Sequence, residues 1–151
     1  RERYGFEPVW VEAAPDLSAM LETADAALII GDSVFRELNS KLPSIDLAAE
    51  WKEHTGLPFV FAFWAGYEGT LDADEIDALQ AAKEAGVAHV DEITRAYAAE
   101  KGGDPVLYRR YLSKHIHFSL GEGEIEGLRL FYAKARQHDL IDSVPSLDFF
   151  S

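Results

Sequence analysis

The sequence predicts an α/β fold, in which buried strands alternate with helices. Residues 26–30 (AALII) are an uninterrupted apolar run that ends in a glycine and a carboxylate, Gly31 and Asp32. Residues 59–64 (FVFAFW) are apolar at every position, so a strand formed there needs cover on both faces. Helical patterns stand between and around the two runs, and this order is typical of a parallel sheet.

The chain before the first run predicts one strand and one helix. Residues 8–12 alternate weakly between apolar and polar side chains, which indicates a short strand. Pro15 and Asp16 then open a helix, because both residue types are favoured at helix starts. One face of that helix is apolar and carries Leu17, Met20 and Leu21.

Two helices and a loop separate the two predicted central strands. Residues 33–38 indicate a short helix, and residues 39–44 (NSKLPS) have the composition of a loop. A second helix is expected around residues 46–54. It stops at residues 55–58 (TGLP), since glycine and then proline commonly follow a helix C-terminus. Because it is apolar on both faces, the strand at residues 59–64 is expected at the centre of its sheet.

Beyond Gly66 the pattern predicts helices alone. Residues 72–75 (DADE) place carboxylates in a first helical turn, where they favour the positive end of the helix dipole. An apolar stripe continues from there at helical spacing, with Gly86 as a break. The stripe consists of Ile76, Leu79, Ala82, Val90, Ile93 and Tyr97.

The last two predicted helices have recognisable starts. Asp104 and Pro105 are a cap followed by proline at the first helical position. The final helix is expected at residues 121–138, with Ser119 and Glu122 at the spacing of a capping box. Its buried stripe is predicted to be Ile125, Leu128, Phe131 and Ala135.

Charge and composition exclude several classes of protein. The chain has 27 acidic and 14 basic residues, and its net charge of −13 repels nucleic acid and anionic membranes through their phosphates. A small anionic substrate is still compatible, because helix N-termini and backbone N–H groups make a pocket locally positive. The chain has no cysteine, which excludes disulfides, thiolate chemistry and cysteine-based zinc sites.

Length and the start of the chain give the expected compartment and extent. A hydrophobic content of 48% over 151 residues suffices for a substantial core, and this length favours a single domain. No apolar run approaches the roughly 20 residues that span a bilayer, and no signal-peptide core follows residues 1–4. We therefore expect a cytoplasmic protein. The chain starts without methionine, so we also expect it to be a piece of something longer.

The corner formed by Gly31, Asp32 and Ser33 is the candidate ligand site, because ligands of α/β proteins collect where strands end and helices begin. Glycine lets a ligand approach the backbone, and a helix start near Ser33 directs N–H groups at an anion or a hydroxyl. Asp and Ser are also common helix caps, so a purely structural role is the alternative. The two roles are compatible.

The other patterns favour structure over chemistry. His115 and His117 stand on alternate residues without a third ligand nearby, so neither a metal nor another cofactor is expected. Residues 121–127 (GEGEIEG) lack the spacing of a phosphate loop, and their three glutamates repel phosphate. No cysteine and no Gly-x-Ser-x-Gly elbow supports a nucleophilic triad. Trp51 and the aromatic residues of 59–64 are interpreted first as core.

Four segments carry a family resemblance. In order and spacing, residues 25–32 (DAALIIGD), 46–51 (DLAAEW) and 55–64 (TGLPFVFAFW) are similar to the chorismate dehydratase family of the futalosine route to menaquinone. The later residues 111–132 resemble the C-terminal helices of the same family. The resemblance covers nearly the whole chain.

The resemblance implies a type II periplasmic-binding-protein-like two-lobe fold, with the active site in the cleft between two α/β lobes. Residues 1–57 correspond to part of the second lobe, and residues 58–151 to the return strand and C-terminal helices of the first lobe. Members of the family are hydro-lyases that convert chorismate to 3-[(1-carboxyvinyl)oxy]benzoate and water. By this resemblance Gly31, Asp32 and Ser33 line the cleft and bind substrate, and residues 51–59 shape its hinge side.

The chain departs from the family in one large respect. The family's N-terminal part, with first-lobe strands, an asparagine of the catalytic site and serine or threonine anion contacts, has no counterpart here. No catalytic residue is therefore assigned, and the chain alone is expected to be inactive. A related dihydroxynaphthoate synthase carries a His-Glu pair where Gly31 and Asp32 stand, so Gly31 favours the dehydratase while it removes the most obvious general base.

The expected partner is a small-molecule substrate, chorismate, with no nucleic acid and no membrane. The alternative functions are a non-catalytic protein of the same fold that binds an aromatic acid, and the related dihydroxynaphthoate synthase. Because the strand at residues 59–64 needs neighbours on both faces, the chain is expected to need its missing N-terminal segment or to self-associate.

Overall fold

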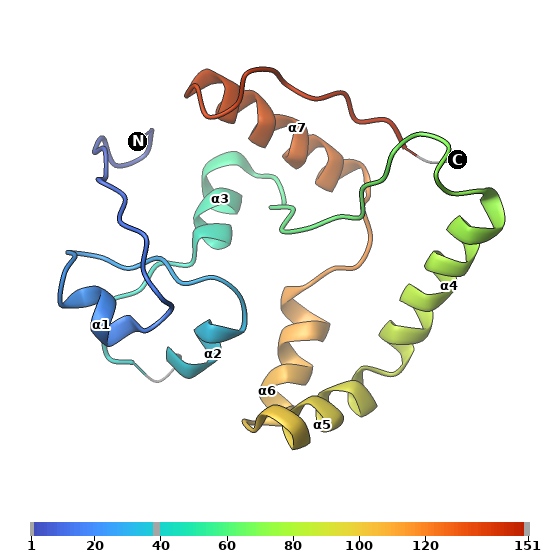
Figure 1. Cartoon of the computed structure of the whole chain (residues 1–151), viewed down its shortest axis with the longest axis horizontal. Helices are drawn as coiled ribbons and strands as arrows, with labels where there is room; N and C mark the ends of the chain where they lie inside the picture. Colours follow the sequence, from blue (N-terminus) through green and yellow to red (C-terminus); the bar gives the residue numbers. More distant parts are fainter. Residues whose placement is uncertain (1, 38–39, 150–151) are drawn as a thin grey trace. The chain divides into compact units, whose positions relative to one another are not determined.

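The computed structural model of the chain describes residues 2–37 and 40–149, and the regular structure in them is helical (Figure 1). By its contacts the chain divides into two units, Arg1–Ile45 and Asp46–Ser151. The lobe boundary predicted between residues 57 and 58 stays a prediction.

The predicted strands are not formed within the described residues. Residues 8–12, 26–30 and 59–64 are neither helix nor strand, so the predicted strands of the α/β fold are wrong for this part of the chain. A strand exists only through hydrogen bonds to a neighbouring strand, and the described residues supply no such neighbour to these apolar segments. The two-lobe periplasmic-binding-protein-like arrangement stays a prediction.

The first unit begins with a short helix, α1 (Leu17–Leu21). The carboxylate of Asp16 accepts a hydrogen bond from the Ala19 N–H at 3.0 Å and so caps the helix. The helix start that the sequence predicted at Asp16 is confirmed.

A second helical segment of this unit consists of a 3₁₀ turn, η1 (Gly31–Ser33), that runs directly into α2 (Val34–Glu37). The helix predicted for residues 33–38 is confirmed as far as Glu37. Leu38 and Asn39 lie outside the described residues.

The second unit begins with α3 (Leu47–Thr55), which has a cap at each end. The Asp46 carboxylate accepts hydrogen bonds from the N–H groups of Ala48 and Ala49 at 2.9 and 3.2 Å. Gly56 ends the helix with φ at 75°, a left-handed conformation that favours glycine. Both ends of this helix agree with the sequence prediction.

α3 and α7 (Glu122–Gln137) both contact the turn at Pro58. The indole N–H of Trp51 donates to the Pro58 carbonyl at 3.1 Å. The rings of Phe59 and Phe131 lie edge-on to Trp51, with centroids at 5.8 and 6.0 Å, and at 5.5 Å from each other. Such edge-to-face contacts add to the stabilisation from buried apolar area. We call these three rings the aromatic cluster.

Of the buried stripe predicted on α7, Leu128 and Ala135 are buried and Ile125 is partly buried, whereas the prediction is wrong for Phe131, which is 41% exposed. The start of α7 differs from the prediction, because Gly121 stands at its N-cap. The Gly121 N–H donates to the Glu124 carboxylate at 3.1 Å, so the capping box predicted for Ser119 and Glu122 is wrong. Both pairs have the same spacing of three residues, and the helix uses the second of them.

α4 (Ala73–Ala88) begins with a complete capping box. The Asp72 carboxylate accepts from the Glu75 N–H at 2.9 Å, and the Glu75 carboxylate accepts from the Asp72 N–H at 3.0 Å. The helix start predicted from the carboxylates of residues 72–75 is confirmed.

The break predicted at Gly86 is wrong, because α4 continues through it. His89 separates α4 from α5 (Val90–Lys101), three residues further on. A glycine inside a helix costs only about 1 kcal/mol relative to alanine, which is too little to end a helix that its other residues favour.

α6 (Pro105–Arg110) starts as predicted, with the Asp104 carboxylate accepting from the Val106 N–H at 2.8 Å. It continues into a π-helical turn, η2 (Tyr111–His115). None of the helices in the described residues is long and apolar enough to cross a membrane.

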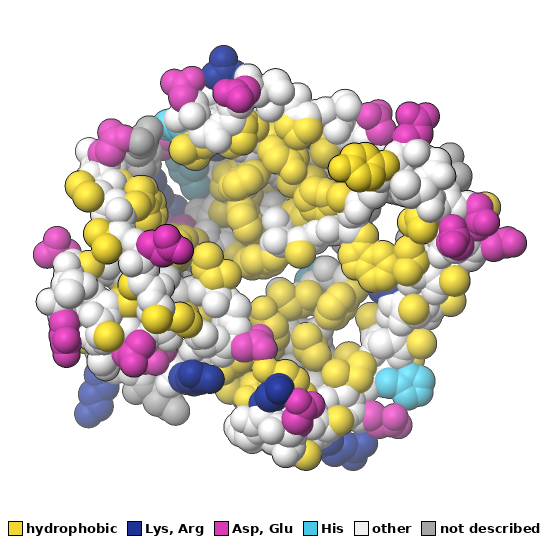
Figure 2. Space-filling view, viewed as in Figure 1, with side chains coloured by type: hydrophobic (Ala, Val, Ile, Leu, Met, Phe, Trp, Pro, Cys, Tyr) yellow, Lys and Arg dark blue, Asp and Glu magenta, His cyan; other side chains and the backbone are white. Residues whose placement is uncertain are grey.

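Much apolar surface is left without cover. The accessible surface is 12,229 Å², whereas two separate compact units of these lengths would together expose about 9,000 Å². Phe61 and Trp64 of the second predicted strand are 65% and 75% exposed. Figure 2 shows hydrophobic side chains in view over much of one face of the molecule. The need for a missing segment or for self-association stays a prediction.

Candidate functional site

The predicted corner is a real change of backbone direction. Ile30 is extended, with φ at −127° and ψ at 146°, and the helical turn begins at the next residue. Gly31 adopts φ at 75°, a value that residues with a side chain rarely take. The chain therefore needs glycine at this position to enter the turn.

Open space surrounds the corner. No atom lies within 4 Å of the position that a Cβ of Gly31 would occupy, so its backbone angle and not a close neighbour requires glycine. Gly31 and Asp32 are exposed, and Ser33 is partly buried. A ligand has room to approach the backbone here.

The alternative structural role, in which Asp32 or Ser33 caps the helix α2, stays a prediction. The turn starts at Gly31, so Ile30 stands at the N-cap and makes no side-chain cap. Asp32 and Ser33 lie one and two residues inside the 3₁₀ turn, so neither the Asp32 carboxylate nor the Ser33 hydroxyl caps its start.

The second resembling segment, around α3, serves the fold. The side chain of Thr55 accepts from the Leu57 N–H at 3.1 Å and donates to the Trp51 carbonyl at 2.8 Å. The Lys52 ammonium donates to the Gly56 carbonyl at 2.6 Å. These bonds fix the turn that returns the chain from α3 to Phe59, and they confirm that residues 55–58 stop the helix.

Metal ligation finds no support among the described residues, which contain no group of three or more His, Asp or Glu side chains placed to hold an ion. His115 stacks on Tyr111, with ring centroids 6.3 Å apart and ring planes at 21°. This contact ties His115 to the π-helical turn.

A hollow of about 260 Å³ that the sequence did not predict lies between α5 and α6. Arg95 and Arg109 both line it, one from each helix. No local pattern connects two residues this far apart in the chain, so only the packing of the helices shows that they share one site.

Comparisons with known proteins give the chain its relatives. A sequence profile of the family described as menaquinone biosynthesis matches residues 1–137. The chain is 29% identical over 130 residues to a protein of Thermus thermophilus named chorismate dehydratase, and the alignment covers 74% of this chain. It covers 48% of that protein, so the chain spans about half the length of this curated relative. No solved structure matches the chain.

Proposed function

Because the chain belongs to the menaquinone biosynthesis family, we propose that it is part of a chorismate dehydratase, a cytoplasmic hydro-lyase. The reaction converts chorismate to 3-[(1-carboxyvinyl)oxy]benzoate and water. The observation that carries the proposal is the alignment with the Thermus thermophilus protein over 74% of this chain. That alignment covers about half of the relative, so the activity is assigned to the whole protein that carries this chain.

The proposed reaction needs no covalent bond between the substrate and the protein. Loss of the ring proton and the ring hydroxyl makes the ring aromatic, and aromatisation drives the reaction. The protein has to hold the dicarboxylate in one orientation and assist the departure of the proton and the hydroxyl.

Each of the three residues at the corner has its own role in this proposal. Gly31 lets the substrate approach the backbone, since nothing occupies the space beside its Cα. The negative charge of Asp32 repels the two carboxylates of the substrate. The Asp32 carboxylate therefore meets the substrate at its hydroxyl group, from which it accepts a hydrogen bond. The Ser33 hydroxyl donates a hydrogen bond to one of those carboxylates.

The experiment is a calorimetric titration of the whole protein with chorismate, run beside detection of the product by its aromatic absorbance. The proposal expects binding and turnover together. Binding without turnover overturns the enzyme and leaves a binding protein, and the absence of both overturns the proposal as a whole.

A matched pair of variants tests the corner. A hydrogen bond to a charged group contributes about 1.5–3 kcal/mol, so Asp32→Asn is expected to lower kcat/KM about 10- to 100-fold. Asp25→Asn removes the same charge from an exposed position that lies before the predicted strand and is expected to leave kcat/KM unchanged. Equal effects of the two substitutions would remove Asp32 from the site.

A further inference from the structure

The helices α5 and α6 form a hairpin with a firmly held turn. The Tyr97 and Tyr108 rings meet edge to face, with centroids 5.0 Å apart, and the Tyr108 hydroxyl donates to the Gly102 carbonyl at 3.0 Å. Gly103 adopts φ at 91°, and a Cβ there would lie 2.1 Å from the Tyr108 hydroxyl oxygen. These contacts hold α5 and α6 against each other, and the two helices form the walls of the hollow between them.

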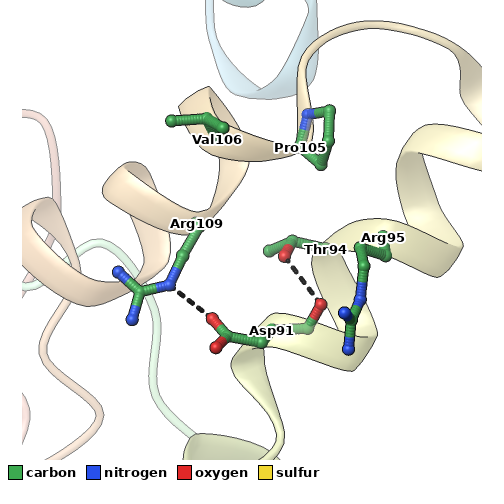
Figure 3. A pocket seen from close by; sticks show the side chains of 6 residues that line it. All are labelled: Asp91, Thr94, Arg95, Pro105, Val106 and Arg109. Atoms are coloured by element: carbon green, nitrogen blue, oxygen red, sulfur yellow. Dashed lines mark hydrogen bonds and ion pairs between the residues drawn. The ribbon is translucent and has the colours of Figure 1, made fainter.

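Two kinds of side chain line this hollow (Figure 3). Asp91, Thr94 and Arg95 come from α5, and Pro105, Val106 and Arg109 from α6. Thr94 is only 2% exposed, and its hydroxyl donates to the Val90 carbonyl at 2.9 Å, so it forms a packed floor. The hollow thus combines apolar surface from Pro105 and Val106 with charge from two arginines.

The side chains that line the hollow have a net charge of +1, from Arg95 and Arg109 against Asp91. The Nε–H of Arg109 donates to the Asp91 carboxylate, which fixes the plane of its guanidinium. Arg109 makes no other interaction with the described residues, so the N–H groups of its two terminal nitrogens are available to donate hydrogen bonds to a ligand. Arg95 makes no hydrogen bond or ion pair with any described residue, and Figure 3 shows it on the other side of Asp91 from Arg109.

The surroundings of the hollow are basic in an otherwise acidic chain. Residues 95–114 hold five of the 14 lysines and arginines and two of the 27 acidic residues. With Asp91 and Glu92 included, residues 91–114 hold five basic and four acidic residues, so this segment repels an anion less than a chain of net charge −13 does as a whole.

We propose that the hollow binds a small organic monocarboxylate, whose carboxylate pairs with the Arg109 guanidinium while its apolar body lies on Pro105 and Val106, with Arg95 adding positive charge from the other side of Asp91. Guanidinium groups bind carboxylates through two parallel hydrogen bonds, which gives this pairing its preference. One excess positive charge matches a single carboxylate. A volume of about 260 Å³ is just below the range of sites for drug-sized ligands and suits a molecule the size of benzoate. The hollow is lined by residues of the second unit alone, so the proposal stands whether or not the proposed dehydratase activity does.

The test is a titration of the full chain with benzoate, followed by saturation-transfer NMR, which observes the ligand and tolerates assemblies of the protein. The proposal expects saturable binding with a Kd in the millimolar range, because the hollow is open and its charges are exposed. Benzyl alcohol has the same ring without the charge and is expected to bind at least about tenfold more weakly. Inorganic phosphate lacks the ring and is expected to compete poorly with benzoate.

Three glutamine variants locate the binding. Arg109→Gln is expected to weaken benzoate binding at least about tenfold, and Arg95→Gln to weaken it about threefold. The matched control is Arg110→Gln, which removes a positive charge from the next position of α6, outside the lining of the hollow, and is expected to change binding less than twofold. The Arg109 side chain is 58% exposed, so its substitution removes little buried packing.

Three outcomes overturn the proposal. They are no saturable binding of benzoate, equal binding of benzoate and benzyl alcohol, and equal loss of binding in the Arg109 and Arg110 variants. Thermal unfolding of each variant is measured beside the titration, and a variant that melts like the parent chain while it loses benzoate supports the site.

Discussion

Gly127→Ala gives the sharpest test of how α7 packs. Gly127 is buried in α7, and a Cβ built on it would lie 2.3 Å from the Pro58 carbonyl oxygen. Real Cβ atoms essentially never come closer than 3.0 Å to a neighbour, so α7 and the Pro58 turn have to separate by about 1 Å. The carbonyl is not free to rotate away, because it accepts the indole N–H of Trp51.

The magnitude follows from three terms. Overpacking against rigid backbone costs about 1–3 kcal/mol, and loosening the bond from Trp51 to Pro58 costs about 1 kcal/mol. Alanine recovers about 1 kcal/mol of helix propensity relative to glycine. We therefore expect Gly127→Ala to lower the free energy of unfolding by about 2 kcal/mol.

The matched control is Gly86→Ala in the interior of α4. No atom lies within 4 Å of the position of a Cβ there, so this substitution is expected to raise the free energy of unfolding by up to about 1 kcal/mol. Urea unfolding followed by tryptophan fluorescence measures both variants at one protein concentration, since association would add to the apparent stability. A Gly127→Ala chain as stable as the Gly86→Ala chain would refute the close approach of α7 to Pro58.

Three further outcomes are expected. Trp51→Phe leaves the Pro58 carbonyl without its donor and should lower the free energy of unfolding by about 1 kcal/mol in the same urea assay, whereas an unchanged midpoint would show that the bond contributes nothing. Asp72→Ala removes the capping box of α4 and should cost about 1 kcal/mol, with loss of helical circular dichroism on heating at a lower temperature. With Phe61 and Trp64 exposed, the chain alone should scatter light as a dimer or larger species, and a clean monomer would count against its need for further protein.

Local signals in the sequence predicted the helix ends well. Asp16, Asp46 and Asp104 each cap the helix that follows them, and Gly56 ends α3 with the left-handed angle that its position suggested. A cap depends on a side chain and the backbone two or three residues away, so a short window of sequence contains all that decides it. The family resemblance, which also rests on short segments, is confirmed.

Features that depend on contacts between distant residues could not be predicted from the sequence. The runs at residues 26–30 and 59–64 have the composition of strands, but a strand also requires a neighbour, and composition carries no record of whether one is present. The corner was predicted as a change from extended chain to helix, and Gly31 confirms that geometry through its φ of 75°. The hollow between Arg95 and Arg109 depends on how two helices pack, which no spacing within one helix reveals.

Chorismate as the substrate is the central proposal for this protein. The most direct measurement is the consumption of chorismate by the whole protein that carries this chain, with the product identified by mass as one water lighter and by its aromatic absorbance. The account predicts that each chorismate lost gives one molecule of 3-[(1-carboxyvinyl)oxy]benzoate. A folded protein that binds chorismate and returns it unchanged would contradict it.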